Sequence, residues 1–346
     1  MISPTSPTSP TLPHRTRTRA ALLASTALLL AACGAQVQPS AAPGASTPAE
    51  ATVTNCGAQV TYPVPQRPVA YDVSGVEKMF SLGLADRMRG YVMNSLGDPS
   101  IAGSPWKDDY AKVERLGTKR VTREILVDAK ADWVIAGWNS GFSEERGITP
   151  TLLEQVGIRS YLHTETCWDY PKSQADVTPM EALYTDLTNL GQIFGVQKRA
   201  EELVAELRGR MDTVRAGAPK DKPPVRVFVY DSGTDQAFTA GRHAAPNDVI
   251  AAAGGANVFA TLEDGWGAVG WEAVVKTEPE VIIVVDYADQ PAADKIAFLK
   301  AHPALASSPA VRDNRFHVIS YGDMVSGPRN VQGAESLAAY LRSIGR

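Results

Sequence analysis

The chain has 346 residues, of which 44% are hydrophobic and 21% are charged, and its formal net charge is −4 at pH 7. This composition is typical of a globular protein, and the length corresponds to about two domains. A mildly acidic chain without a basic cluster lacks what phosphate contacts require, which argues against a nucleic-acid partner.

The N-terminal residues have the layout of a secretory signal. A positively charged region over residues 14–19 precedes an uncharged apolar stretch over residues 20–32, and Leu30-Ala-Ala-Cys33 ends it. A membrane span needs roughly 20 apolar residues, so this run fits a signal better than a transmembrane anchor. We expect residues 1–32 to be a signal peptide of the bacterial lipoprotein kind. Cys33 would then be the lipidated first residue of an exported, membrane-anchored protein.

Residues 33–53 are rich in Ala, Pro, Ser and Thr and contain almost no large apolar residue. Such a stretch cannot bury enough surface to offset the entropy lost on ordering, so it is predicted to be a disordered tether. Cys56 and Cys167 remain after Cys33 is assigned to the lipid. In an exported chain, two remaining cysteines predict one disulfide between them, with two free thiols as the alternative. The disulfide would contribute about 2–4 kcal/mol.

Strand and helix patterns alternate along residues 54–196. Predicted strands cover 67–71, 88–93, 132–136 and 159–162, and predicted helices cover 74–82, 122–129 and 150–156. Ser74-x-x-Glu77 has the pattern of a capping box, and Gly83 is expected to end that helix. Strands that alternate with helices favour a parallel α/β sheet.

A long helical region follows. Thr178, Pro179 and Glu181 are a cap, a first-turn proline and a capping acid, and the helix that they open is interrupted at Gly195. It resumes over residues 197–216 with an apolar stripe of Leu203, Leu207, Met211 and Val214.

A second α/β series then begins, with strands at 225–230, 281–285 and 315–320 and helices at 246–253, 291–300 and 330–344. The predicted fold is therefore α/β, with two Rossmann-like lobes (54–196 and 217–346) joined by a single long helix (197–216). The ligand cleft would lie between the lobes.

The motifs of common enzymes are missing from the sequence: there is no Gly-x-Ser-x-Gly, Walker A, His-Glu-x-x-His or Gly-x-Gly-x-x-Gly pattern. Without a nucleophile and base, a secreted enzyme is disfavoured, and no cofactor is expected. A purely structural lipoprotein is the other alternative, although it would have no reason to expose many rings in one groove.

Aromatic and polar residues gather in the loops at the strand ends. Ligands of open α/β sheets bind at the carboxyl ends of the strands, and aromatic side chains suit a bulky, partly planar or chelated molecule. The predicted lining residues are Tyr71, Asp72, Trp138, Asn139, Phe142, Glu165, Trp168, Tyr230, Asp231, Phe238, Trp266, Asp286, Tyr287 and Tyr321. Arg329 and Arg242 are candidates to meet an anionic group of the ligand.

A metal site is a further alternative. His163, Glu165, His243 and Asp323 include the ligand types of a hard-metal or zinc site, but their spacing is not diagnostic. Solvated loop histidines are the competing interpretation.

Four segments carry a family resemblance. They are 67–87 (RPVAYDVSGVEKMFSLGLADR), 132–137 (DWVIAG), 238–259 (FTAGRHAAPNDVIAAAGGANVF), and 271–275 (WEAVV) followed by 279–283 (PEVII). Through them the chain resembles solute-binding proteins of the iron-siderophore and vitamin B12 class, which serve bacterial ABC importers. The resemblance implies a monomer that captures a ferric siderophore or similar metal chelate in the periplasm or at the outer face of the cytoplasmic membrane and delivers it to a permease.

The same resemblance implies that one acidic residue on each lobe docks on the permease, and the matching positions are Glu114 and Glu272. Alternative ligands are a corrinoid, haem, another cofactor precursor, or a divalent metal bound directly. The Cys56/Cys167 pair and the loop His163–Trp168 are not general features of the class, which suggests a sub-branch with its own ligand.

Overall fold

The computed structural model describes residues 50–170, 177–287 and 289–346, and these belong to one compact unit. The predicted signal peptide and Cys33 lie outside the described residues. The predicted tether also lies outside them except for residues 50–53, where the prediction is wrong because they form a strand. In the ranges that are described, no helix is both long and apolar enough to cross a membrane.

That strand belongs to an antiparallel hairpin of β1 (Glu50–Asn55) and β2 (Ala58–Pro63), which the sequence analysis missed. The turn residues Cys56 and Gly57 have φ values of 47° and 79°, as a type I′ turn requires. The hairpin packs on α6 (Pro179–Ile193), where Asn189 Nδ2 donates to the Thr54 carbonyl at 2.9 Å.

The predicted disulfide is confirmed. Cys56 and Cys167 are bonded, with their Cα atoms 5.1 Å apart and a sequence separation of 111 positions. The bond ties the turn of the β1–β2 hairpin to the loop that follows β7.

The N-terminal lobe is built on a parallel sheet with strand order β5-β4-β3-β6-β7. Its strands are β3 (Pro68–Tyr71), β4 (Gly90–Val92), β5 (Arg115–Gly117), β6 (Trp133–Ala136) and β7 (Arg159–Leu162). Its helices are α1 (Asp72–Ser81), α2 (Pro99–Ala102), α3 (Lys107–Lys112), α4 (Arg123–Asp128) and α5 (Pro150–Glu154), with short 3-10 turns at Ala85–Arg87, Ser95–Gly97 and Thr164–Thr166.

The C-terminal lobe is built on a second parallel sheet, with strand order β10-β8-β12-β13. Its strands are β8 (Val225–Tyr230), β10 (Gly255–Asn257), β12 (Val281–Asp286) and β13 (Phe316–Ser320), and β9 (Ala237–Ala240) pairs with β11 (Trp266–Val269) as a separate antiparallel hairpin. Its helices are α8 (Ala245–Ala252), α9 (Trp271–Lys276), α10 (Ala292–Ala301), α11 (Pro309–Arg312), α12 (Tyr321–Met324) and α13 (Asn330–Ser343), with a 3-10 turn at Pro303–Leu305.

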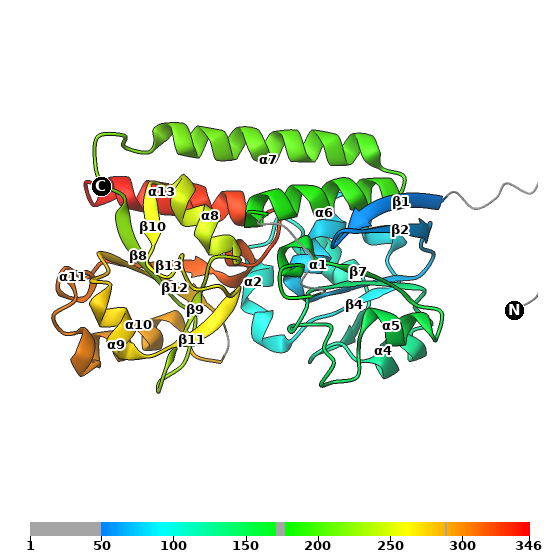
Figure 1. The fold of residues 1–346 in the computed structure, drawn as a ribbon, viewed down its shortest axis with the longest axis horizontal. Helices are drawn as coiled ribbons and strands as arrows, with labels where there is room; N and C mark the ends of the chain where they lie inside the picture. Colours follow the sequence, from blue (N-terminus) through cyan, green and yellow to red (C-terminus); the bar gives the residue numbers. More distant parts are fainter. Residues whose placement is uncertain (1–49, 171–176, 288) are drawn as a thin grey trace, which may run out of the picture. The chain divides into compact units, whose positions relative to one another are not determined.

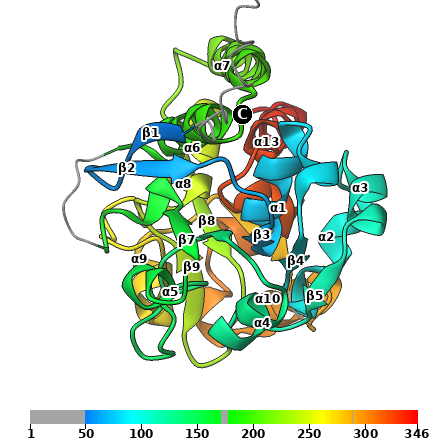
Figure 2. The same ribbon diagram turned by 90° about the vertical axis from the view of Figure 1, so that its right-hand side faces the viewer.

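Helix α7 (Gln197–Gly217) connects the two lobes and lies across the outside of α6 and α13 (Figures 1 and 2). The predicted apolar stripe is its buried face. Gly195, at φ 68°, makes the turn from α6 into α7. The prediction of two α/β lobes joined by one long helix is confirmed, while the residue numbers chosen for the lobe boundaries stay a prediction.

One local prediction is wrong. Helix α1 begins at Asp72, two residues before the expected start, and no side chain caps it. Glu77 therefore does not complete a capping box, and its side chain is buried against Arg329 and Tyr110. Gly83 ends the helix region as expected, with φ at 73°.

Candidate functional site

A cavity of about 460 Å³ opens at the carboxyl ends of the strands of both lobes. Because parallel strands present their carboxyl ends at one edge of a sheet, residues that directly follow different strands meet there. In the N-terminal lobe these are Asp72 after β3, next to Tyr71 at the end of that strand, Gly137 and Trp138 after β6, and His163 after β7. In the C-terminal lobe they are Asp231 after β8, Tyr287 after β12 and Tyr321 after β13. We call this cavity the cleft.

The structure places most of the predicted lining residues in the wall of the cleft. These are Tyr71, Asp72, Trp138, Asn139, Glu165, Trp168, Asp231, Phe238, Trp266, Tyr287 and Tyr321. Asp286, at the end of β12, does not line the cleft. The strand-end rule thus brings together residues from segments that are far apart in sequence.

Two predicted aromatics belong to the core instead. Phe142 is 0% exposed and packs in the apolar core of the N-terminal lobe. Tyr230 is 0% exposed in the core of the C-terminal lobe, and its hydroxyl donates to the Gly233 carbonyl at 3.0 Å. Both predictions are wrong because these rings fill the lobe interior rather than the cleft.

Arg329 is not a ligand-binding residue of the cleft either. Its side chain is only 2% exposed, and Nε donates to Asp323 Oδ1 at 2.6 Å. Nη1 donates to the Ser100 carbonyl at 2.9 Å and to Glu77 Oε1 at 3.3 Å. We call Arg329, Asp323 and Glu77 the arginine cluster. It is a structural tie between the lobes, so the predicted anion-binding role is wrong.

Arg242 does not line the cleft, and its guanidinium pairs with the exposed Glu263 at 3.0 Å. The structure does not bring Arg242 to the cleft, and its role in meeting an anionic ligand stays a prediction.

The four residues of the alternative metal site are not assembled. Asp323 is held by Arg329, and His163 Nδ1 lies 2.9 Å from Lys78 Nζ. Burial lowers the pKa of His163 to about 4, so this ring is neutral and accepts from the lysine. No group of three or more His, Cys, Asp and Glu side chains in the described part of the chain is placed to hold a metal ion. The prediction of a metal site at these residues is wrong.

Lys78 instead organises a buried polar cluster behind the cleft. Its Nζ donates to Asp186 Oδ2 at 2.7 Å and to Ser326 Oγ at 3.2 Å. Burial favours the neutral form of Asp186, but the lysine ammonium prevails and holds the pKa of this carboxyl well below its usual range. Because Ser326 belongs to the C-terminal lobe, this cluster is a second buried connection between the lobes.

The aromatic side chains of the cleft are arranged in stacked pairs. Ring centroids lie 3.8 Å apart for Trp138 and Tyr170, 4.1 Å for Tyr287 and Tyr321, 4.6 Å for Trp168 and His243, and 6.2 Å for Phe238 and Trp266. The Trp168–His243 pair joins one lobe to the other. Such pairs offer flat apolar surface in fixed orientations to a planar or bulky ligand.

The polar lining of the cleft is acidic. Its five carboxylates are Asp72, Glu165, Asp169, Asp231 and Asp264. Among the residues that the structure describes, Arg120 is the only lysine or arginine in the lining, and its Nη1 donates to the carbonyls of Ser140 at 3.1 Å and Asn139 at 3.3 Å. Sequence analysis missed Arg120 because it lies beyond β5, which was not predicted.

Burial shapes the ionisation of these acids. It raises the pKa of Asp72 and of Asp231, and it raises the pKa of Glu165 to about 7. Asp72 adopts φ 61° at the start of α1, and its Oδ2 accepts a hydrogen bond from the Tyr321 hydroxyl at 3.0 Å. Aspartate tolerates this left-handed conformation better than most non-glycine residues.

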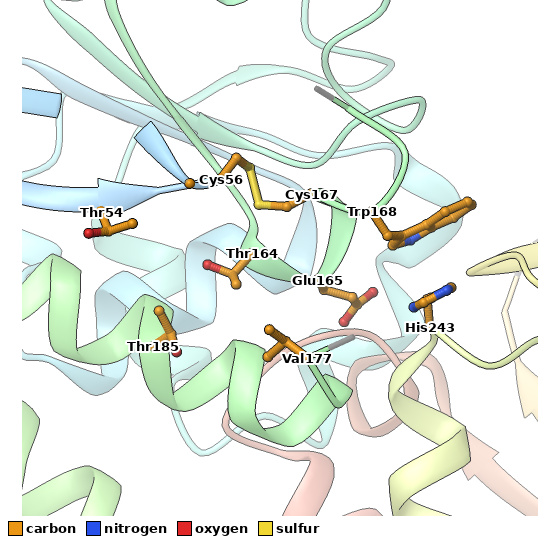
Figure 3. Close-up of a pocket in the computed structure, with 10 residues that line it drawn as sticks. Thr54, Cys56, Thr164, Glu165, Cys167, Trp168, Val177, Thr185 and His243 are labelled. Atoms are coloured by element: carbon orange, nitrogen blue, oxygen red, sulfur yellow. A yellow bond between two sulfur atoms is a disulfide. The ribbon is translucent and has the colours of Figure 1, made fainter. Parts of the chain in front are cut away.

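A smaller cavity of about 130 Å³, which we call the side chamber, shares Glu165, Trp168 and His243 with the cleft (Figure 3). Trp168 and His243 close one side of it, and the Cys56–Cys167 disulfide and Thr54 lie towards the other.

Known proteins resemble this chain along most of its length. Residues 69–321 match the family model described as periplasmic binding protein. The chain belongs to the periplasmic binding protein family. It is 26% identical over 279 residues, 79% of both chains, to the ABC transporter substrate-binding lipoprotein YvrC of Bacillus subtilis. It is 25% identical over 234 residues to a vitamin B12-binding protein of Yersinia pseudotuberculosis, covering 64% of this chain and 77% of the relative.

A solved structure agrees with this assignment. The crystal structure of a periplasmic binding protein from Veillonella parvula superimposes with a TM-score of 0.71 at 27% identity, covering 85% of this chain and 98% of that one. The predicted class, the solute-binding proteins of ABC importers, is confirmed. Members of this periplasmic binding protein family are transport components rather than enzymes.

Proposed function

We propose that this periplasmic binding protein captures a metal chelate of the ferric siderophore kind outside the cytoplasm and delivers it to the permease of an ABC importer. The observation that carries the proposal is the cleft of about 460 Å³ lined by stacked aromatic pairs. Its volume lies in the range of ligand sites, roughly 300–1,000 Å³. Rings in fixed orientations suit the rigid, bulky shell of a chelate better than a small flexible solute.

The location of the protein is part of the same proposal. Residues 1–32 would direct export, and a lipid on Cys33 would hold the monomeric protein at the membrane beside the permease. The relative YvrC is named a lipoprotein, which supports this arrangement. Labelling with radioactive palmitate, compared with a Cys33→Ser variant, tests it.

A corrinoid is the second candidate ligand. The five carboxylates of the cleft would repel the two propionates of haem, whereas a corrinoid presents amide groups that donate hydrogen bonds to carboxylates. The vitamin B12-binding relative from Yersinia pseudotuberculosis supports the same alternative.

Titration of tryptophan fluorescence tests the proposed ligand class, because Trp138, Trp168 and Trp266 line the cleft. The protein with Cys33→Ser and no signal peptide would be titrated with ferric hydroxamates, ferric catecholates, cobinamide and haem. Saturable quenching by a ferric siderophore at micromolar concentration supports the proposal. Quenching by cobinamide alone would support the corrinoid instead, and silence across all four classes would overturn the proposal.

Docking on the permease is tested separately. Glu114 and Glu272 are exposed on different lobes, where their carboxylates can meet arginines of the transporter; Glu114 also pairs with Arg89. With both changed to Ala, we expect uptake into cells to be lost while ligand affinity in solution is unchanged. Glu124→Ala, at an exposed site on α4, is the control. Intact uptake in the double variant would contradict the docking role.

A further inference from the structure

The side chamber is lined by one carboxylate, that of Glu165, and among the described residues His243 is the only other ionisable side chain in its wall. In the described part of the chain, Glu165 is the one acidic residue of its lining, and neither lysine nor arginine lines it. Glu165 Oε2 is buried and accepts no hydrogen bond from any described residue. A buried carboxylate oxygen without a partner is rare, because burial removes the water that would otherwise solvate it.

The groups around Glu165 do not supply the missing partner. The Ser326 hydroxyl lowers the pKa of the carboxyl group, but Oε2 has no hydrogen-bond partner among the described residues. The charge of Lys78 also acts on it, but the ammonium is already bound by Asp186, His163 and Ser326. His243, in the same wall, has its Nε2 3.4 Å from Glu263 Oε2. An incoming cation would therefore meet an acceptor that the protein itself does not satisfy.

The size and walls of the side chamber define what can reach this acceptor. Its volume of about 130 Å³ is less than a third of the 460 Å³ of the cleft, so it has no room for a chelate core. Apart from Glu165, its wall includes the disulfide, threonine side chains and the Trp168 ring, on which the His243 ring is stacked; these surfaces suit a short methylene chain (Figure 3). A slender arm that ends in a positive charge matches both features.

We propose that the side chamber binds a cationic arm of the ligand, an alkylammonium group, with Glu165 as its counter-ion, while the metal-binding core occupies the cleft. This inference rests on the proposed function, since it assigns a second part of the same chelate to a second compartment. The other carboxylates of the cleft also attract the positively charged arm, because they outnumber Arg120 in the lining. The guanidinium of Arg120 is itself bound to backbone carbonyls.

A matched series of ferric trihydroxamates tests the arm without changing the core. Ferrioxamine B ends in an ammonium group, its N-acetyl derivative is neutral there, and its N-succinyl derivative ends in a carboxylate. We expect ferrioxamine B to bind about tenfold more tightly than the acetyl form, as one partly buried charge pair predicts, and the succinyl form to bind most weakly. In Glu165→Gln, the ratio of the affinity for ferrioxamine B to the affinity for its N-acetyl derivative should fall to about one.

Controls separate this subsite from general electrostatics and from the proposed function. Asp212→Asn removes one negative charge from the exposed face of α7 and should leave the ratio unchanged. Equal affinities for the three derivatives, or a ratio that persists in Glu165→Gln, overturn the subsite and leave the chelate-binding function standing. If no trihydroxamate binds, n-pentylammonium becomes the probe, and the melting temperature is measured with and without it. A rise in melting temperature supports the subsite if n-pentanol does not reproduce it and Glu165→Gln abolishes it. No change in melting temperature overturns the subsite.

Discussion

The arginine cluster and the side chamber each leave one carboxylate oxygen buried without a hydrogen-bond partner, Glu77 Oε2 and Glu165 Oε2. The surroundings of the two carboxylates differ. Arg329 donates to the other oxygen of Glu77 and also to Asp323, the Ser100 carbonyl and Ser320, and Glu77 lines neither cavity. Glu165 faces a cavity in which no lysine or arginine among the described residues lines the wall. An unpartnered buried carboxylate oxygen is therefore not by itself a sign of function; what distinguishes Glu165 from Glu77 is the cavity beside it and the lack of a neighbouring guanidinium.

Breaking the arginine cluster should have the largest effect. Arg329→Met leaves two buried carboxylates without their cation, and we expect the free energy of unfolding to fall by about 3–5 kcal/mol in urea denaturation. Arg159→Met, which removes an exposed pair with Glu154, should change it by about 0–1 kcal/mol. Similar losses in the two variants would show that Arg329 is not a structural tie.

Removal of the disulfide tests how much this bond in the wall of the side chamber stabilises the protein. Changing both Cys56 and Cys167 to Ser should lower the free energy of unfolding by about 2–4 kcal/mol, because the bond constrains a long loop in the unfolded chain. Reduction of the unaltered protein with dithiothreitol should lower its stability by a similar amount. A stability equal to that of the oxidised protein would contradict the prediction.

Aromatic residues of the cleft should affect binding and leave stability nearly unchanged. Trp266→Ala removes a half-buried ring from the cleft wall, and we expect the affinity for the bound chelate to fall about tenfold, as loss of an aromatic anchor predicts. Tyr230→Phe, in the core, should leave affinity unchanged and reduce stability by about 1 kcal/mol through its lost hydrogen bond to Gly233. Fluorescence titration and urea denaturation of both variants measure the contrast.

The pH dependence of ligand binding tests whether the ionised form of Glu165 is the form that binds the cation. Burial raises the pKa of Glu165 from 4.5 to about 7, so the folded protein binds more protons there than the unfolded chain in this range. Glu165 thus reduces stability as pH rises from 4.5 to 7 in the unliganded protein. A cation favours the charged carboxylate, so ferrioxamine B affinity should rise about threefold between pH 6 and pH 8.

Other charged groups around Glu165 define the control. Lys78, Asp186 and Asp248 act on it, and His163 and His243 line the same cleft. The pH dependence should therefore be compared with that of Glu165→Gln and of the N-acetyl derivative. A rise of the same size in both would assign the effect to another group.

The sequence predicted the fold well because strong local signals agreed with the topology. The continuous apolar run of β12, the Thr178 cap of α6 and the apolar stripe of α7 each had one consistent interpretation. The β1–β2 hairpin escaped prediction because each strand buries a single apolar side chain, Val53 or Tyr62, which is too weak a pattern, and its position depends on packing against α6.

The site was predictable where topology determines position and not where side-chain partners do. Residues at strand ends such as Asp72 and Trp138 line the cleft by virtue of the parallel sheet. Nothing in the local sequence showed that the Phe142 ring packs in the core. Nor did it show that Glu77 contacts Arg329, from which it is separated by 252 positions in the chain. Buried ion pairs of this kind are contacts between distant segments, which spacing along the chain does not encode.

The position of the disulfide has a consequence for when the protein acquires its cargo. Cys167 immediately precedes Trp168, so oxidation of the pair fixes the ring that separates the side chamber from the cleft. A chain newly made in the reducing cytoplasm has not yet received this bond. We therefore expect weak ferrioxamine B binding by the reduced protein, measurable by titration in dithiothreitol. Maturation would then coincide with arrival, and the receptor would become competent only on the side of the membrane where its cargo is found.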